Sequence, residues 1–306
     1  VIKAQKPDVV VLTNLESWVC NGMLKRKHPG ILRILDMPNV EHILYSQQLA
    51  AKCIDAAANP EWKRLKREEG QLHHVCQGLF ACSDDDSQLL SELNGNRLTC
   101  ITVPNGVACE QAKFDTNTAK HESQSLLFCG TLSYPPNVDG LNWFVKDIFP
   151  LILNNHPTIR LRVVGRNFDD ARFPGVSQHP SVDVIGEVDA VRPEYLQTGI
   201  AICPLRMGSG TRLKILESMS FGSPTVSTSI GCEGIRAVDG ESILIRDNAQ
   251  TFADGVNQLL SSPVEFHALR QQARSFVEAN YDWKVVGSIA ANQIIEWHAA
   301  RNEVAV

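Results

Sequence analysis

A tract between Pro204 and Pro224 brings glycines, cations and a carboxylate together at spacings that suit an anion site. Gly208 and Gly210 permit sharp backbone turns with close approach. Thr211 suits the N-cap of the helix that the apolar spacing predicts after it. The start of a helix presents free N–H groups and the positive end of the helix dipole, and both favour a bound anion. The tract therefore predicts an anion-binding loop.

Two cations and one carboxylate make this prediction more specific. Arg212 and Lys214 fall in the first helical turn, where the dipole disfavours positive charge unless an anion is present. Glu217 lies on the same side of the helix as Lys214, and a carboxylate can accept hydrogen bonds from a ribose diol. We expect a nucleoside diphosphate, with its diphosphate on Gly210, Arg212 and Lys214 and its ribose on Glu217. The alternative is a solvated helix end with a local Lys–Glu pair.

Composition limits the class of protein. The 306 residues, 43% hydrophobic and 21% charged, are enough for two globular domains. A net charge of −5 argues against a general nucleic-acid binder, and no apolar run approaches the length of a membrane span. The nine cysteines are odd in number and never spaced C-x-x-C, so we expect free thiols in a cytoplasmic protein. No histidine or cysteine spacing predicts a metal site.

Strand and helix patterns alternate along the chain, which predicts an α/β fold with mostly parallel sheets. A polar segment at 108–125 predicts a linker. We expect a first domain at 1–118, a second at 119–282, and a last helix at 283–306 that packs back on the first. The expected strands are 7–13, 31–35, 78–82, 98–103, 126–130, 159–164, 182–186, 199–203, 225–228 and 242–245.

In such sheets, ligands bind beyond the carboxyl ends of the strands. Gly130, Gly165, Gly208 and Gly210 follow predicted strands and should share that edge. The cleft between two such domains is the expected site.

The tract 208–226 resembles the donor-binding signature of retaining glycosyltransferases of family four, which have the GT-B fold of two Rossmann-like domains facing a cleft. The resemblance extends over nearly all of 79–300. Supporting matches are Val103–Val107, Gly130 with Pro135-Pro136-Asn137, Arg162–Gly165 and Gly231–Gly234. It implies transfer of a sugar from a UDP- or GDP-linked donor, with retention and with no metal or cofactor. The Gly-Thr-Arg-x-Lys-x-x-Glu variant looks like a branch associated with surface polysaccharides or lipid-linked glycans.

The resemblance carries residue roles onto this chain. It implies a glycan or lipid-linked acceptor, and a cytoplasmic location that extends to the inner face of the membrane. It places the ribose on Glu217. The donor-contacting set is Gly130, Thr131, Gly165, Arg166, Gly208, Ser209, Gly210, Thr211 and Glu217.

Departures from the family pattern affect the donor site. The residue eight positions before Glu217 is Ser209, so the carboxylate that usually holds the donor sugar is absent. Thr131 stands where the family has Arg, and Pro136 or Asn137 stands near the family's Lys. We infer that Arg212 and Lys214 take over the diphosphate.

The first domain departs further. Nothing before Pro7 supplies the family's first strand and glycine-rich loop, so we expect an incomplete domain. Asp36 follows a predicted strand and could orient the acceptor hydroxyl; the alternative, slightly favoured, is that Asp36 and Asn39 cap a helix that begins near Glu41. The basic run at 25–28 predicts a solvated loop, or else a contact with anionic lipid or a phosphorylated acceptor.

Two other functions fit the same fold. A nucleotide-sugar epimerase would need acid–base carboxylates in the cleft, and the sequence singles out none. A non-catalytic donor-binding protein that needs a partner chain is favoured by Ser209 and the short first domain. No G-x-G-x-x-G follows a strand, which argues against a dinucleotide-dependent oxidoreductase. The sequence sets no oligomeric state.

Overall fold

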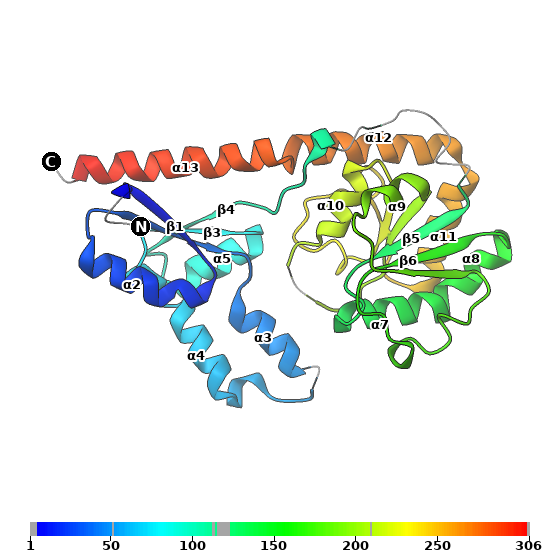
Figure 1. The fold of residues 1–306 in the computed structure, drawn as a ribbon, viewed down its shortest axis with the longest axis horizontal. Helices are drawn as coiled ribbons and strands as arrows, with labels where there is room; N and C mark the ends of the chain where they lie inside the picture. Colours follow the sequence, from blue (N-terminus) through cyan, green and yellow to red (C-terminus); the bar gives the residue numbers. More distant parts are fainter. Residues whose placement is uncertain (1–4, 51, 112–113, 115–122, 209, 305–306) are drawn as a thin grey trace. The chain divides into compact units, whose positions relative to one another are not determined.

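A computed structural model describes residues 5–50, 52–111, 114, 123–208 and 210–304 (Figure 1). The chain divides into two compact units. The first runs to Asn105 and resumes from Lys284, and the second is Gly106–Trp283. The expected domain boundary at residue 118 lies outside the described residues.

Four parallel strands form the sheet of the first unit, in the order β1-β2-β3-β4. Side chains alternate between its faces, so Leu35 and Leu79 pack into one hydrophobic cluster. Ile34 and Phe80 pack into the other. The Trp297 ring of the last helix, α13, stacks on Phe80 with ring centroids 5.4 Å apart, so α13 covers this second face (Figure 1). The elements are β1 (Val9–Thr13), β2 (Leu32–Met37), β3 (Gly78–Ala81), β4 (Thr99–Thr102) and α13 (Trp283–Val304).

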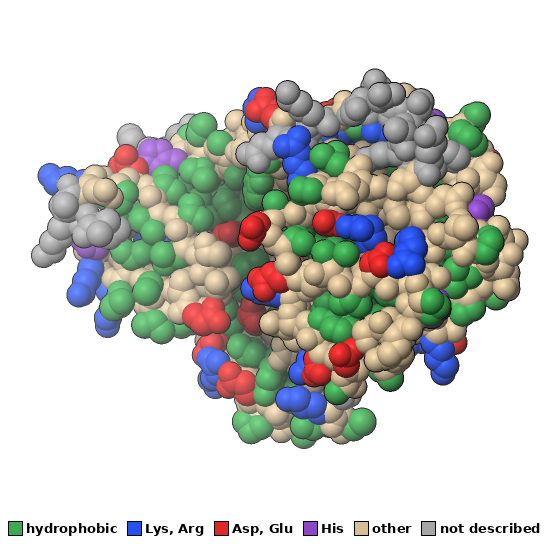
Figure 2. Space-filling view, turned by 45° about the vertical axis from the view of Figure 1, so that its right-hand side comes forward, with side chains coloured by type: hydrophobic (Ala, Val, Ile, Leu, Met, Phe, Trp, Pro, Cys, Tyr) green, Lys and Arg blue, Asp and Glu red, His purple; other side chains and the backbone are tan. Residues whose placement is uncertain are grey.

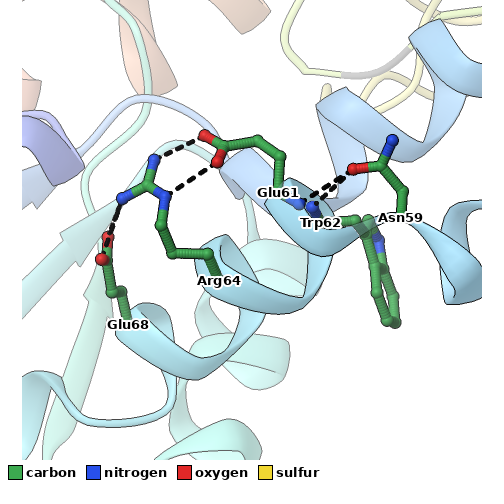
Figure 3. A network of polar contacts seen from close by, with 5 residues as sticks. All are labelled: Asn59, Glu61, Trp62, Arg64 and Glu68. Carbon is green, nitrogen blue, oxygen red and sulfur yellow. Dashed lines mark hydrogen bonds and ion pairs between the residues drawn. The ribbon is translucent and has the colours of Figure 1, made fainter.

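Short helices connect these strands, and side chains cap the starts of several of them, α4 and α5 included. The Ser83 hydroxyl accepts a hydrogen bond from the N–H of Asp86 and so caps the start of α5. Asn59 caps α4 in the same way, and Arg64 bridges two glutamates along the exposed side of that helix (Figure 3). The connecting elements are η1 (Leu15–Ser17), α2 (Trp18–Lys27), α3 (Glu41–Ala50), η2 (Ala56–Ala58), α4 (Pro60–Glu69), η3 (Leu72–His74) and α5 (Asp84–Leu93).

The prediction of a loop for the basic run was wrong. Lys25, Arg26 and Lys27 form the last turn of α2, and His28 is its C-cap residue. Positive charge is favourable at this end of a helix. The Lys25 ammonium also donates a hydrogen bond of 2.6 Å to the carbonyl oxygen of His74. The position at the end of α2 and the hydrogen bond of Lys25 therefore account for these cations within the first unit.

The second unit has six parallel strands in the order β10-β9-β8-β5-β6-β7. Its first strand, β5, lies in the middle. The chain therefore winds outward on one side from β5 to β7 and on the other from β8 to β10, the doubly wound order. The strands are β5 (Ser125–Cys129), β6 (Arg160–Val164), β7 (Val182–Gly186), β8 (Ile200–Cys203), β9 (Thr225–Ser227) and β10 (Leu244–Ile245).

Helices cover both faces of this sheet. Leu126 and Phe128 pack with Phe252 of α11 on one face, whereas Leu127 and Cys129 pack with Tyr195 of α9 on the other. The remaining elements are η4 (Cys109–Gln111), α7 (Pro135–Trp143), η5 (Phe144–Ile148), α8 (Phe149–Asn155), η6 (Asp170–Arg172), α9 (Arg192–Gln197), α10 (Leu213–Ser220), α11 (Ala249–Ser261) and α12 (Pro263–Asn280).

Pro150 does not end the helical segment in which it lies. The π-helical segment η5 separates α7 from α8, and Pro150 occupies the first turn of α8. Proline lacks an N–H and suits a first turn, where no partner for that N–H is needed. The helical backbone therefore continues from α7 through the π-helical segment to the end of α8 at Asn155.

Over the described residues, no helix is long and apolar enough to cross a membrane, and no group of three or more His, Cys, Asp or Glu could hold a metal ion. The nine cysteines are free. Cys53 lies beside an apolar stretch of the sequence, yet it is exposed. Acidic and basic side chains are interspersed over the face drawn in Figure 2, in keeping with the small net charge of −5.

Candidate functional site

The site is organised around the point where the strand order of the second unit reverses, between β5 and β8. Loops that leave neighbouring strands in opposite directions open a crevice at this point, the usual ligand site of such sheets. The loop after β5 starts at Gly130, and the loop after β8 carries the glycine tract into α10. The sequence-predicted residues of both loops therefore belong to one edge of one sheet.

The loops after β5 and β6 touch through their backbones. A Cβ atom on Gly165 would lie 1.7 Å from the carbonyl oxygen of Gly130, so only glycine fits there. The N–H of Leu132 donates to the carbonyl oxygen of Arg166 at 2.9 Å, while the Arg166 side chain is exposed. Three residues predicted for the donor site, Gly130, Gly165 and Arg166, thus lie next to one another.

Helix α7 supports the loop after β8. Asp139 accepts two hydrogen bonds from the Arg206 guanidinium, at 2.6 and 3.0 Å, and that guanidinium also lies over the Trp143 ring. A Cβ atom on Gly140 would lie 2.6 Å from the carbonyl oxygen of Pro204, which shows how closely the loop rests on the helix. The loop that leads to α10 is therefore held before the helix starts.

Arg212 folds back over the glycine tract. Gly208 has φ of 119°, and a Cβ there would lie 2.7 Å from the Arg212 guanidinium. That guanidinium donates to the carbonyl oxygen of Gly210 at 2.6 Å, and Arg212 is 8% exposed. Arg212 itself occupies the N-cap position of α10, so the prediction that Thr211 caps the helix was wrong. Ser209 lies outside the described residues.

Lys214, the second residue of α10, reaches across the reversal point. Its ammonium donates to the side-chain oxygen of Asn137 on α7 at 2.8 Å. It lies 4.7 Å from the centre of the Phe128 ring, at the end of β5. A Cβ atom on Gly130 would be 2.9 Å from the ammonium nitrogen, so the missing side chain makes room for it. Burial lowers the pKa of Lys214.

Glu217 lies one turn further along α10 and is half-buried. Burial raises the pKa of its carboxyl group, and the charge of Lys214 and the Tyr195 hydroxyl counteract that rise. Tyr195 is fully buried, and its hydroxyl donates to the carbonyl oxygen of Lys214 at 3.1 Å. Across the part of the chain that the structure describes, Lys214 and Glu217 form no ion pair. The alternative of a local Lys–Glu pair therefore does not describe this helix start.

Asp36 belongs to the first unit, where it is the fifth of six residues in β2. It is half-buried, and burial raises the pKa of its carboxyl group. The cap of α3 comes from Glu69, whose carboxylate accepts from the N–H groups of Glu41 at 2.6 Å and His42 at 3.3 Å. The interpretation of Asp36 and Asn39 as the cap of that helix was therefore wrong.

Comparisons with known proteins find relatives of this chain in sequence and in fold. Residues 123–262 match the family described as Glycosyl transferases group 1. An uncharacterized 44.6 kDa protein in the cps region of Klebsiella pneumoniae is 29% identical over 184 residues, or 58% of this chain and 46% of that protein. The glycogen synthase of Mycobacterium tuberculosis is 24% identical over 309 residues, or 94% of this chain and 69% of that protein. The solved structure of Anabaena Alr3699/HepE in complex with UDP has a TM-score of 0.72 at 11% identity, and the match covers 96% of this chain and 80% of that one.

The family match falls on the second unit and includes the whole tract from Gly208 to Glu217. The fold match extends over both units, and with the parallel sheets found in each it establishes the GT-B fold that the sequence predicted. The sequence match thus likens the second unit to group 1 glycosyl transferases, and the structural match likens the fold of both units to that of the Anabaena protein. The chain spans about half the length of the first of these relatives.

Proposed function

We propose that this chain is the donor-binding part, with an acceptor-side unit, of a retaining glycosyltransferase. It would move a sugar from a UDP- or GDP-linked donor to a glycan or a lipid-linked acceptor, without a metal ion. The observation that carries the proposal is the Lys214 ammonium, held beside Gly130 where the strand order reverses. The glycogen synthase among the relatives supports a glycan product, and the UDP in the Anabaena structure supports a nucleoside diphosphate donor.

The diphosphate would lie against the first turn of α10. There it would meet the free N–H groups of the helix, the Arg212 guanidinium and the Lys214 ammonium. When the bond between the sugar and the diphosphate breaks, negative charge grows on the leaving phosphate oxygen. Cations that are fixed in advance stabilise this charge without reorganising, which is the contribution that a metal ion makes elsewhere.

The ribose would lie on Glu217. An ionised carboxylate has two oxygens and can accept one hydrogen bond from each hydroxyl of a diol. Its place one turn after Lys214 matches the separation of ribose and diphosphate along a nucleotide. Because burial raises the pKa of Glu217, the charge of Lys214 helps to keep the carboxylate ionised.

The acceptor side is assigned to the first unit, with Asp36 as its candidate catalytic residue. Its carboxyl group comes near the carboxyl end of β2, where ligands of parallel sheets bind. A raised pKa suits a group that takes a proton from a sugar hydroxyl, because it brings the pKa nearer to neutral pH. Asp36→Asn should reduce turnover and leave nucleotide binding unchanged.

Calorimetry with UDP, GDP and uridine tests the donor assignment. Glu217→Gln should weaken uridine and UDP by a similar factor, about tenfold for one charge-assisted hydrogen bond. The matched control is Glu241→Gln, an exposed carboxylate of the same unit, which should leave both affinities unchanged. An effect of Glu217→Gln on UDP but not on uridine would contradict the ribose assignment. Binding of neither UDP nor GDP by the unaltered chain would contradict the proposed function.

A further inference from the structure

We infer that Asn137 is a positioning residue for the donor diphosphate: it holds the Lys214 ammonium at the reversal point without placing a negative charge against it. The inference rests on the proposed function, and it adds to that function a residue outside the set predicted for the donor site. The inference has two parts: Asn137 fixes the position of the ammonium, and its side chain is uncharged.

Both ends of the Asn137 amide are occupied. Its side-chain oxygen accepts from the Lys214 ammonium at 2.8 Å, and its NH₂ group donates to the carbonyl oxygen of Thr131 at 2.9 Å. This orientation is fixed, because a flipped amide would turn its NH₂ group towards the ammonium. Asn137 is 5% exposed. It therefore ties the loop after β5 to the first turn of α10, across the point where the strand order reverses.

Neutral groups hold this ammonium. Its partners are the Asn137 amide and the face of the Phe128 ring, 4.7 Å from the ring centre. Within the described residues, no carboxylate lies within ion-pair distance of Lys214. A buried lysine that serves only the fold is normally paired with an acid, because desolvation of an unpaired charge is costly. Here the charge stays available to an incoming anion.

An aspartate at position 137 would separate the two roles. It has nearly the same size and would hold the ammonium more strongly, since hydrogen bonds between charged groups are stronger. It would also cancel the charge that the diphosphate needs. Asn137→Asp should therefore lower the affinity for UDP tenfold or more and change the affinity for uridine less than twofold. A residue that only joins α7 to α10 would give no such difference between UDP and uridine.

The control variant places the same charge change elsewhere on the same helix. Asn142 also belongs to α7, and its amide donates to the carbonyl oxygen of Arg172 at 2.8 Å, on the exposed side. Asn142→Asp should leave the affinities for UDP and uridine within twofold of the unaltered chain. A loss of UDP binding in Asn142→Asp equal to that in Asn137→Asp would show a long-range charge effect and overturn the inference.

The experiment combines calorimetry with UDP and uridine and an NMR titration of the Lys214 side chain in the full chain. We expect the Asn137→Asp change to raise the pKa of Lys214 while UDP affinity falls and uridine affinity holds. UDP affinity within twofold of the unaltered chain, or equal loss of UDP and uridine, would overturn the inference. If the unaltered chain binds neither UDP nor GDP, the proposed function fails by itself. The titration then still tests the contact between Asn137 and Lys214. An unchanged pKa of Lys214 in Asn137→Asp would contradict that contact.

Discussion

The two ends of α10 each have a pair of basic side chains beside them, in opposite relation to the helix dipole. At the C-terminal end, Arg270 and Arg274 come from α12 and are 2% and 7% exposed. Arg270 donates to the carbonyl oxygen of Gly222 at 2.8 Å, and Arg274 donates to that of Ser220. These are carbonyl groups that the end of a helix leaves without partners, and the dipole there favours cations.

At the N-terminal end, the dipole opposes the cations. Arg212 donates to the backbone of the glycine loop, and Lys214 donates to a neutral amide. Burial lowers the pKa of Lys214, which means that the fold makes its charged form less favourable. The comparison teaches that similar residues at the two ends have different uses. The C-terminal pair satisfies carbonyl groups of the fold, and the N-terminal pair is the one that we propose binds the donor diphosphate.

The largest effect is expected from Arg274→Ala. This change removes donors to Ser220 and to the Cys109 carbonyl oxygen at 2.8 Å, and leaves buried acceptors without partners. We expect the free energy of unfolding to fall by about 3 kcal/mol, measured by urea denaturation. Arg160→Ala, in an exposed ion pair, is the matched control and should have little effect. A fall no greater than in the control would break the comparison at its C-terminal end.

At the other end, Arg212→Ala and Lys214→Ala should act on binding. Each should weaken UDP or GDP by about 1.5–3 kcal/mol, the value of a charge-assisted hydrogen bond, in calorimetry. Their free energies of unfolding should change less than that of Arg274→Ala, because the N-terminal charges oppose the dipole. Lys146→Ala, an exposed lysine of η5, is the control. Unchanged nucleotide affinity in both variants would remove the distinction between the two ends.

The pH dependence of UDP binding sharpens the same distinction. Binding needs ionised Glu217, whose pKa burial raises, so affinity should fall as pH drops through that raised value. It also needs charged Lys214, whose pKa burial lowers, so affinity should fall again as pH rises through that lowered value. Beyond each limit, affinity should change up to about tenfold per pH unit, or about 1.4 kcal/mol. Glu217→Gln should abolish the acid limb measured with uridine, which has no phosphate group to take up a proton, and Lys214→Arg should abolish the alkaline limb measured with UDP. Calorimetry across pH would contradict the assignment if either limb survived its substitution.

Local signals in the sequence predicted much of the fold. The starts of α11 and α12 follow from such signals, because Asn248 and Ser262 are caps with an apolar helical period directly after them. The parallel order followed from the alternation of strand and helix. The tract from Gly208 to Glu217 stands out for the same reason, since its glycines, cations and carboxylate are neighbours in the chain.

Contacts between distant parts of the chain could not be predicted in this way. Lys214 meets Asn137 across 77 residues, and Arg274 meets Ser220 across 54. The acceptor for α3 comes from Glu69, 28 residues beyond Glu41. A helix end can be satisfied by any polar group that packing brings to it, and packing is decided by the whole core. The sequence therefore showed which charged residues stand near helix ends. The structure showed which of them have hydrogen-bond partners elsewhere in the fold.

A third helix end gives the smallest expected effect and a reference for the other two. At the start of α5, the Ser83 hydroxyl accepts from the N–H of Asp86, and the first turn carries three aspartates. Here side chains satisfy the first-turn N–H groups and the dipole, whereas the N-cap residue of α10 makes no side-chain cap hydrogen bond. Ser83→Ala should lower the free energy of unfolding by about 1 kcal/mol in urea and leave UDP binding unchanged. The result matters for α10, because it measures in this protein what one satisfied helix start contributes to stability. A loss near zero would mean that helix starts need no cap here, and the cations of α10 would then no longer indicate a ligand.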